Sequence, residues 1–443
     1  MKSENPGHVC FVEWARRSLV RLPSGAGAES VDLHPLGEMI GDATVVALSE
    51  ATHGGAEPLA FRNRLFQYLV HEKGFTAIAI ESGIVESRKV YEYARGGPDL
   101  LSAVLGEGFS WTFDQLPQNR SLVEWLRQYN EDRRPAQTVN FYGFDVSGSP
   151  GLGRANRGID TALVETLSYL AGVDRTESTS FSARLKALME NLRFDLRRSS
   201  DALLTYDRLT QNQRDALTAA IADLVTLLER READYTAAST LNDYEWAYRA
   251  AIGASQTDSW LRQIPTGWRA SSEPIILPSE HFEFLAVAND VRDRAQADNL
   301  EWIVRREGLG GKILVYAHRY HLSATPVGAR WSVPTGSGRQ EVMGTYLRRR
   351  LGDRLVTIGN LIGKDGSSGV GFRHAPGESL DAVASEIAEP IFFLDLRTAP
   401  DHVARWLEEE HQLAQGDDEF KLAVGRAFDL LLYIDVVNPA YHS

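Results

Sequence analysis

The sequence contains a single cysteine, Cys10, and no long apolar run. One cysteine cannot form an internal disulfide, so we expect a reducing compartment or independence from oxidation. No segment approaches the ~18 uninterrupted apolar residues of a membrane span, and the first residues lack the apolar run of a signal peptide. We therefore expect a soluble cytoplasmic protein with no membrane partner.

Several catalytic and binding patterns are also missing. Neither G-x-x-x-x-G-K-[ST] nor a G-x-G-x-x-G between strand and helix occurs, which argues against nucleotide chemistry. No G-x-S-x-G turn is found, so an acyl-enzyme has no candidate nucleophile. The formal charge is −13 with both signs interspersed, which argues against a nucleic-acid partner.

Hydrophobic residues make up 43% of the chain. In two stretches, about 40–150 and from 312 onward, short apolar runs alternate with helical patterns. Short apolar runs, separated by helical patterns, predict buried strands of a mostly parallel sheet covered by helices. The predicted strands are 43–49, 75–82, 138–145, 312–318, 354–363, 390–397 and 427–437. The predicted helices between them lie near 58–72, 84–95, 121–132, 342–351 and 379–388.

Between these two stretches, from about 158 to 306, the apolar residues recur with the spacing of a helix. Leu217, Ile221, Leu224 and Leu228 are spaced by three or four residues, and a second stripe runs from Phe181 to Leu196. We expect an α/β fold, a mostly parallel sheet flanked by helices, with a large helical insertion or cap. The expected domains are 1–150 for the first part of the α/β core, 151–306 for the helical insertion and 307–443 for the second part. The stretches 147–153 and 363–372 are predicted as flexible loops.

Ionisable residues stand at the ends of four predicted strands. They are Glu50 and His53, Glu81, Asp145, and His318 followed by Arg319 and His321. Ligands of parallel sheets bind at the carboxyl ends of strands, so we expect these residues to share one site. Any one of them alone would more simply be a cap or a solvated turn residue, but several together favour function.

The chemistry open to this set is general acid and base catalysis. A neutral imidazole can take a proton from water when a carboxylate holds its other nitrogen. The implied reaction is direct hydrolysis by activated water. Glu and His could also bind a metal, but Glu50 and His53 lie in a loop and lack the H-E-x-x-H of a zinc helix. We expect neither a metal nor another cofactor.

These motifs together resemble the erythromycin esterase family. The stretch "SEATHGGAEPLAFRNRLFQYLVHEKGFTAIAIESG" is similar to the family's G-E-x-T-H-G, a helix arginine and a strand ending in Glu-x-Gly. "KILVYAHRYH" is similar to its A-H-N-x-H, and "MGTYLRRRLGDRLVTIG" and "AFDLLLYI" also agree. The resemblance runs in order from about residue 40 to 435. It implies an α/β core with helical additions, a deep cleft, and hydrolysis of a macrolide's lactone without an acyl-enzyme.

The resemblance also implies roles for single residues. His53 is similar to the family's general base, Glu50 and Glu81 to the carboxylates that orient it, and His318 to the second essential histidine. Arg62 is similar to the cleft arginine, although periodicity alone would make it a solvated helix residue. His321 matches the last position of A-H-N-x-H, and we count Asp145 among the substrate-binding candidates.

Two positions depart from the family pattern. Ser49 stands where the family has glycine, and Arg319 stands where it has asparagine. Arg319 is a permanent cation, which either pairs with Glu50 or Glu81 or binds an anionic substrate group. A neutral macrolide offers no such group.

Three hypotheses follow. The first is an esterase-like hydrolase that acts on a lactone or other ester of a macrolide or another secondary metabolite. The second is a biosynthetic tailoring enzyme, a lyase or cyclase in which the base drives displacement or elimination of an anionic leaving group held by Arg319 and Arg62. The third is a binding module without catalysis. A protein partner stays open.

Overall fold

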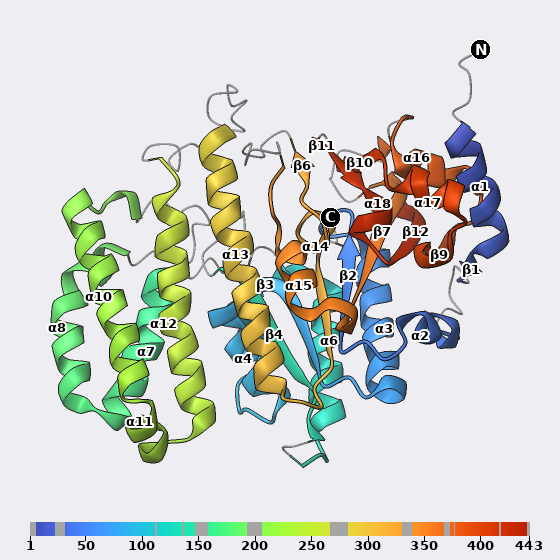
Figure 1. Ribbon diagram of the computed structural model, residues 1–443. Coiled ribbons are helices and arrows are strands. Elements are labelled where there is room, and N and C mark those ends of the chain that lie inside the picture. Colours follow the sequence, from blue (N-terminus) through green and yellow to red (C-terminus); the bar gives the residue numbers. More distant parts are fainter. Residues whose placement is uncertain are drawn as a thin grey trace. The chain divides into compact units, whose positions relative to one another are not determined.

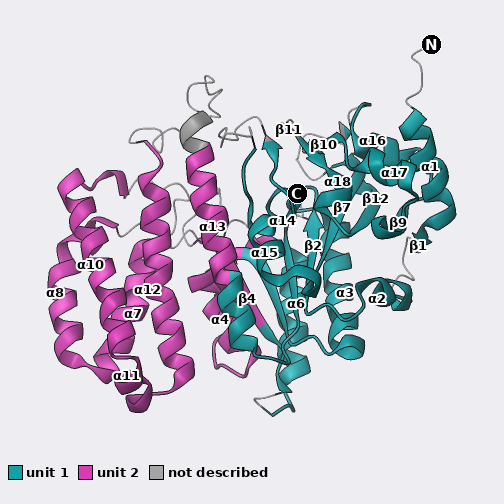
Figure 2. Cartoon of the chain, in the orientation of Figure 1, with its two compact units in different colours: residues 1–81, 116–140, 300–443 teal, residues 82–115, 141–299 magenta. Residues whose placement is uncertain are grey.

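The alternating runs of the sequence form a sheet and surrounding helices in the computed structural model (Figure 1). The structure describes residues 6–22, 32–110, 113–134, 137–146, 158–192, 206–265, 282–329, 339–366, 373–375, 377–415 and 418–440. They group into two units (Figure 2). Unit 1 is 1–81, 116–140 and 300–443, and unit 2 is 82–115 and 141–299.

Unit 1 is an α/β unit. Its strands are β1 (Val20–Arg21), β2 (Val45–Glu50), β3 (Ala77–Gly83, which enters unit 2 at Ser82), β5 (Ile313–His318), β6 (Gly328–Ala329), β7 (Leu355–Asp365), β8 (Arg373–His374), β9 (Ile391–Asp395), β10 (Glu410–Gln415), β11 (Asp418–Ala423) and β12 (Leu430–Val437). Its helices are α1 (Pro6–Ser18), α2 (His34–Ile40), α3 (Ala56–Lys73), α6 (Pro117–Asn130), α14 (Arg319–Leu322), α15 (Met343–Leu351), α16 (Leu380–Ser385), α17 (Asp401–Leu407) and α18 (Val424–Ala427).

The main sheet within unit 1 runs in the order β1-β9-β12-β7-β2-β5-β3. The central pairs β12/β7, β7/β2, β2/β5 and β5/β3 are parallel, whereas β9 runs antiparallel to both β12 and β1. Every residue of β2 and β5 is buried, as expected of parallel strands covered on both faces. The predicted fold class, a mostly parallel sheet flanked by helices, is confirmed.

Helix α3 follows directly from local sequence. Its first turn carries Glu57 and its last turn carries His71 and Lys73, which places each charge at the end of the helix dipole that stabilises it. Gly74 ends the helix in a left-handed conformation with φ of 70°, and its N–H donates to Leu69 O.

Unit 2 carries the helical region that stands between β4 (Asn140–Asp145) and β5 in the sequence. Its helices are α4 (Ile84–Ala94), α5 (Leu101–Gly108), α7 (Ile159–Val173), α8 (Arg175–Leu192), α10 (Gln211–Arg230), α11 (Glu232–Ala238), α12 (Leu241–Arg262) and α13 (Phe282–Glu307, which enters unit 1 at Leu300). A capping box of Thr210 and Gln213 begins α10.

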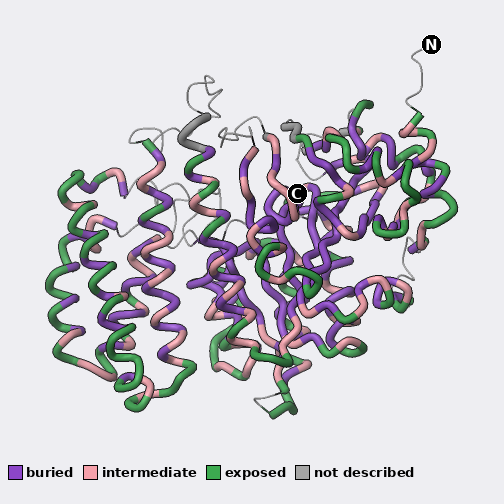
Figure 3. Tube along the Cα trace, in the orientation of Figure 1, coloured by how far each residue is buried: buried purple, intermediate pink, exposed green. Residues whose placement is uncertain are grey.

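Burial confirms both predicted stripes where they are described (Figure 3). The side chains of Leu217, Ile221, Leu224 and Leu228 are all buried in α10, and those of Phe181, Leu185, Leu188 and Leu192 in α8. Leu196 lies outside the described residues.

The predicted loops can be compared with the structure only in part. The predicted loop 147–153 lies outside the described residues, and of 363–372 only 363–366 are described, with 363–365 in β7. A small antiparallel sheet, β10-β11-β6, was not predicted. Among the described helices, none has the length and apolar character needed to cross a membrane.

A glycine allows α15 to approach the end of α14. A Cβ at Gly344 would lie 2.4 Å from Ser323 O and 2.5 Å from the Leu322 carbonyl atoms. We predict that Gly344→Ala lowers the free energy of unfolding by about 1–3 kcal/mol, because backbone atoms must move. Gly310→Ala is the matched control, since nothing lies within 4 Å of its added Cβ. Urea unfolding measures both, and equal midpoints for the two variants would contradict the close approach.

Candidate active site

The carboxyl ends of three neighbouring strands bring the candidate residues of unit 1 together. In the parallel register of β2 and β5, Glu50 stands opposite His318. On the other side of β5, Ile80 pairs with Tyr316, which places Glu81 one residue further along the same edge. The sheet topology therefore supplies two carboxylates and one imidazole at one edge, and the loop after β2 adds His53.

The Glu50 carboxylate is buried, with only 2% of the residue exposed. Its Oε1 lies 2.7 Å from His53 Nδ1, and its Oε2 accepts a hydrogen bond of 2.7 Å from the Tyr316 hydroxyl. A carboxylate only accepts, so Nδ1 of His53 carries the proton and Nε2 presents the lone pair. The His53 side chain is 48% exposed, which leaves the imidazole accessible to small molecules.

Arg62 lies beside this pair on α3. Its guanidinium carbon stands 5.0 Å from the centroid of the Tyr316 ring, and Nη2 donates to Asn119 Oδ1 at 2.8 Å. Burial lowers the pKa of Arg62, while the nearby Tyr316 and Glu50 oppose that shift. The residue is 1% exposed, so it faces the protein interior and not solvent.

His318 is held at both ring nitrogens by backbone groups. Nδ1 accepts from the Tyr320 N–H at 3.2 Å, and Nε2 lies 3.1 Å from Ala51 O. Since a carbonyl only accepts, Nε2 carries the proton and the ring is a neutral imidazole. Burial, followed by the neighbouring His53 ring, holds the pKa of His318 well below its usual value. The two ring centroids are 5.3 Å apart.

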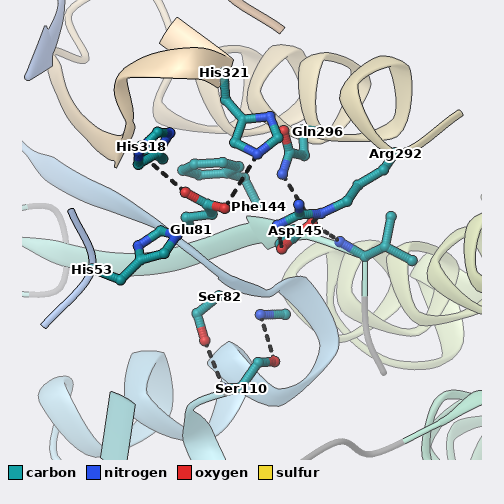
Figure 4. A network of polar contacts seen from close by, with 12 residues as sticks. His53, Glu81, Ser82, Ser110, Phe144, Asp145, Arg292, Gln296, His318 and His321 are labelled. Carbon is teal, nitrogen blue, oxygen red and sulfur yellow. Dashed lines mark hydrogen bonds and ion pairs between the residues drawn. The ribbon is translucent and has the colours of Figure 1, made fainter. Parts of the chain in front are cut away.

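Glu81 forms the second carboxylate–imidazole pair. Its Oε2 accepts from the His318 backbone N–H at 2.8 Å, and its Oε1 lies 3.4 Å from His321 Nε2 (Figure 4). His321 lies on α14, one turn after His318, so Glu81 binds both ends of that turn. Glu81 itself is only 3% exposed.

Ser49 and Asn360 replace backbone pairing where β2 and β7 separate. The two strands pair only from Val45–Leu355 to Leu48–Ile358. Beyond that point the Ser49 hydroxyl accepts from the Asn360 N–H at 2.8 Å, and Asn360 Oδ1 accepts from the Ala51 N–H at 3.0 Å. Ser49, which departs from the glycine of the family motif, therefore stabilises the strand exit with its side chain.

Arg319 pairs with an acid that the sequence analysis did not name. Its side chain is fully buried, and Nη1 donates to Asp381 Oδ1 at 2.8 Å and to Asn360 O at 2.9 Å. Asp381 also accepts from the backbone N–H groups of Ile362 and Ala414, both at 3.0 Å. The structure thus places Arg319 in an interior ion pair with Asp381.

Asp145 belongs to unit 2 and is also paired within the protein. It is fully buried and forms a two-point ion pair with Arg292, whose Nε donates to Oδ1 at 2.9 Å and whose Nη2 donates to Oδ2 at 2.6 Å. Gln296 Nε2 donates to the same Oδ1 at 3.0 Å (Figure 4). This bidentate geometry is that of a strong structural pair.

Several partners of these site residues were not predicted from the sequence, among them Tyr316, Asn360 and Asp381. Tyr316 offered one signal, because a phenol inside the buried run "KILVYAH" needs a hydrogen-bond partner. Asn360 offered a similar one inside "RLVTIGNLIG". Across the described ranges, no group of three or more His, Cys, Asp or Glu side chains is arranged to hold a metal ion.

Comparisons with known proteins agree with this architecture. The family model "Erythromycin esterase" matches residues 70–437. The chain is 23% identical to an erythromycin esterase type II of Escherichia coli over 364 residues, which are 79% of this chain and 76% of that protein.

Solved structures show the same fold. A Bacillus cereus protein superposes with a TM-score of 0.76 at 22% identity, covering 98% of this chain and 99% of that one. The erythromycin esterase EreC in its open conformation superposes with a TM-score of 0.67 at 17% identity, covering 93% and 96%.

Protonation of His318 makes stability depend on pH. Its folded-state pKa lies below the ordinary value of 6.5, so the unfolded chain binds this proton first as the pH falls. The contribution of neutral His318 to the free energy of unfolding is therefore complete above pH 6.5 and is lost as the pH falls toward the folded-state pKa.

Urea unfolding across this pH window should show that the free energy of unfolding depends less steeply on pH in His318→Asn than in wild type. Burial also lowers the pKa of His411, but that residue contributes equally to both proteins. Nitrogen NMR should report a neutral Nε2–H ring, and a charged ring at pH 6.5 would contradict it.

The Arg319–Asp381 pair should couple strongly. Removing one charge leaves the other buried without compensation, so Asp381→Asn should lower the free energy of unfolding by about 3–5 kcal/mol. Arg319→Met combined with Asp381→Asn should recover part of that loss. Glu408→Ala, which breaks the exposed pair with Arg426, is the control and should change stability by under about 1 kcal/mol. Additive losses in the double variant would rule out coupling.

Proposed function

Because the chain belongs to the erythromycin esterase family, we propose that it is a hydrolase that opens a lactone or another ester of a natural product with water activated by His53. The observation that carries this proposal is the Glu50–His53 pair. Its carboxylate is buried at 2% exposure and its imidazole is half-exposed, with Nδ1 and Oε1 2.7 Å apart.

The proposed first step is general base catalysis by His53. Nε2 takes a proton from water, and the hydroxide adds to the ester carbonyl carbon. Glu50 stabilises the resulting imidazolium through Nδ1–H. A buried carboxylate can stabilise the imidazolium only while it stays ionised. The Tyr316 hydroxyl, which donates to Glu50, and the nearby Arg62 guanidinium favour the ionised form.

The tetrahedral intermediate then collapses, breaking the bond between the carbonyl carbon and the alcohol oxygen. The departing alkoxide needs a proton, which the His53 imidazolium returns, so the free base is regenerated. His321, whose Nε2 lies 3.4 Å from Glu81 Oε1, takes up no proton in this scheme. His318 stays neutral in this scheme and acts as a positioning residue, since both of its ring nitrogens bind backbone groups.

Displacement of an anionic leaving group has less support. That hypothesis relied on Arg319 and Arg62 as anion-binding groups. Arg319 is fully buried against Asp381, and Arg62 is 1% exposed and binds Asn119. We therefore place neither arginine in contact with substrate, and we propose a mechanism in which no metal takes part.

The test is hydrolysis by the purified protein of a macrolide lactone and a panel of neutral esters. His53→Ala should lower kcat/KM by about 10²–10⁴-fold, the usual contribution of a general base. His402→Ala, at an exposed histidine on α17, is the control and should match wild type. Activity should survive a chelator. Full activity of His53→Ala, or loss with chelator and recovery with a divalent ion, would overturn the mechanism.

Tyr316→Phe separates positioning from folding. Without the hydroxyl, the Glu50 carboxylate loses the donor on Oε2 but keeps the contact of Oε1 with His53. The loss of a hydrogen bond to a charged group should lower kcat by about tenfold and leave KM little changed. A kcat equal to that of wild type would show that Tyr316 does not act through Glu50.

A further inference from the structure

The chain segment after β12 returns to the loop that carries His53. Asn438 O accepts from the Ala56 N–H, and the Ala440 N–H donates to Gly54 O, both at 2.8 Å. Between these two bonds, Gly55 and Pro439 form an isolated antiparallel bridge. Three successive residues of the C-terminal segment are thus paired with the residues immediately after His53.

A charged contact reinforces this pairing. The Asn438 backbone N–H donates to Glu57 Oε2 at 2.7 Å, and its side-chain Nδ2 donates to Glu57 Oε1 at 2.6 Å. Glu57 lies in the first turn of α3, where the helix dipole already favours a negative charge. Both oxygens of one carboxylate therefore hold a single residue.

Gly55 shows how closely the two segments approach. A Cβ added there would lie 2.5 Å from Val437 Cγ1. Its φ of −76° is open to any residue, so the requirement for glycine comes from contact with the C-terminal segment and not from backbone conformation.

The short loop between β2 and α3 is consequently held at both ends. At its start, Asn360 Oδ1 accepts from Ala51 N–H, and Ala51 O faces His318 Nε2. At its end, Gly54 and Ala56 bond to the C-terminal segment. His53 lies between these two anchors, and because its side chain is 48% exposed, packing alone holds it weakly.

We propose that residues 437–440 form a clamp that positions His53 against Glu50, with Asn438 as a positioning residue. The clamp fixes the backbone of the loop, and the fixed backbone keeps Nδ1 within hydrogen-bond distance of the carboxylate. The effect on catalysis rests on the proposed hydrolase function, whereas the effect on loop order does not.

The test is a double-mutant cycle at the closest contact. Gly55→Ala should separate the two segments and raise the hydrogen-exchange rate of the Ala56 and Ala440 amides, which donate across the pairing. It should also lower kcat by roughly tenfold to a hundredfold with KM little changed, the effect of misplacing a catalytic group. Adding Val437→Ala removes the methyl group that clashes, so the double variant should recover most of the lost protection and kcat relative to Val437→Ala alone. Coupling of this kind is not expected from two independent structural defects.

Asn438→Ala gives a second variant without a new clash. It keeps the backbone pairing but loses the Nδ2 donor to Glu57, so the same amides should exchange about tenfold faster. Asn191→Ala on α8, where Nδ2 bonds its own helix at Ala187 O, is the matched control and should leave these amides unchanged.

The two proposals fail separately. Unchanged exchange at the Ala56 and Ala440 amides in both Gly55→Ala and Asn438→Ala would overturn the clamp, whatever the activity. Additive effects in the cycle would overturn it as well. If wild type hydrolyses no ester yet the exchange cycle behaves as expected, the clamp stands and the hydrolase proposal falls.

Discussion

The interaction on which the candidate site depends is the pair of hydrogen bonds that Glu50 accepts from His53 and Tyr316. A carboxylate buried to this degree is stable as an anion only when donors replace its lost water. One donor belongs to the residue proposed as the base and the other to the neighbouring strand β5. The same two hydrogen bonds therefore stabilise the charge of Glu50 and orient the His53 imidazole. They can form only because the register of β2 with β5 brings Glu50 beside β5.

The surrounding residues extend this arrangement outward by backbone contacts. His318 binds Ala51 O and the Tyr320 N–H, and Asn360 binds the Ala51 N–H. These bonds tie the exits of β2, β5 and β7 to one another at the point where their ladders end. An imidazole half-exposed to solvent, such as that of His53, is positioned by such rigid supports more than by contacts of its own ring.

The strands and the residues at their ends could be predicted from the sequence because both signals are local. Continuous apolar runs indicate parallel strands, and a charged residue directly after such a run indicates the edge of the sheet. The partners of those residues could not be predicted in the same way. Arg319 meets Asp381, 62 residues later, because α14 and α16 both pack against β7. Arg62 is buried although its helix carries charges on several faces, because Tyr316 and Asn119 come from distant parts of the chain.

The buried pair of Arg319 and Asp381 also constrains how sequences of this kind can diverge. A lineage that exchanged the arginine alone would pass through an intermediate whose Asp381 carboxylate keeps the N–H donors of Ile362 and Ala414 but has lost its cation in the interior. The two positions should therefore change together, or in an order that neutralises the acid first. In a relative with asparagine at the position of Arg319, we expect the position of Asp381 to carry a neutral side chain or to find another cation, which makes position 381 informative about ancestry.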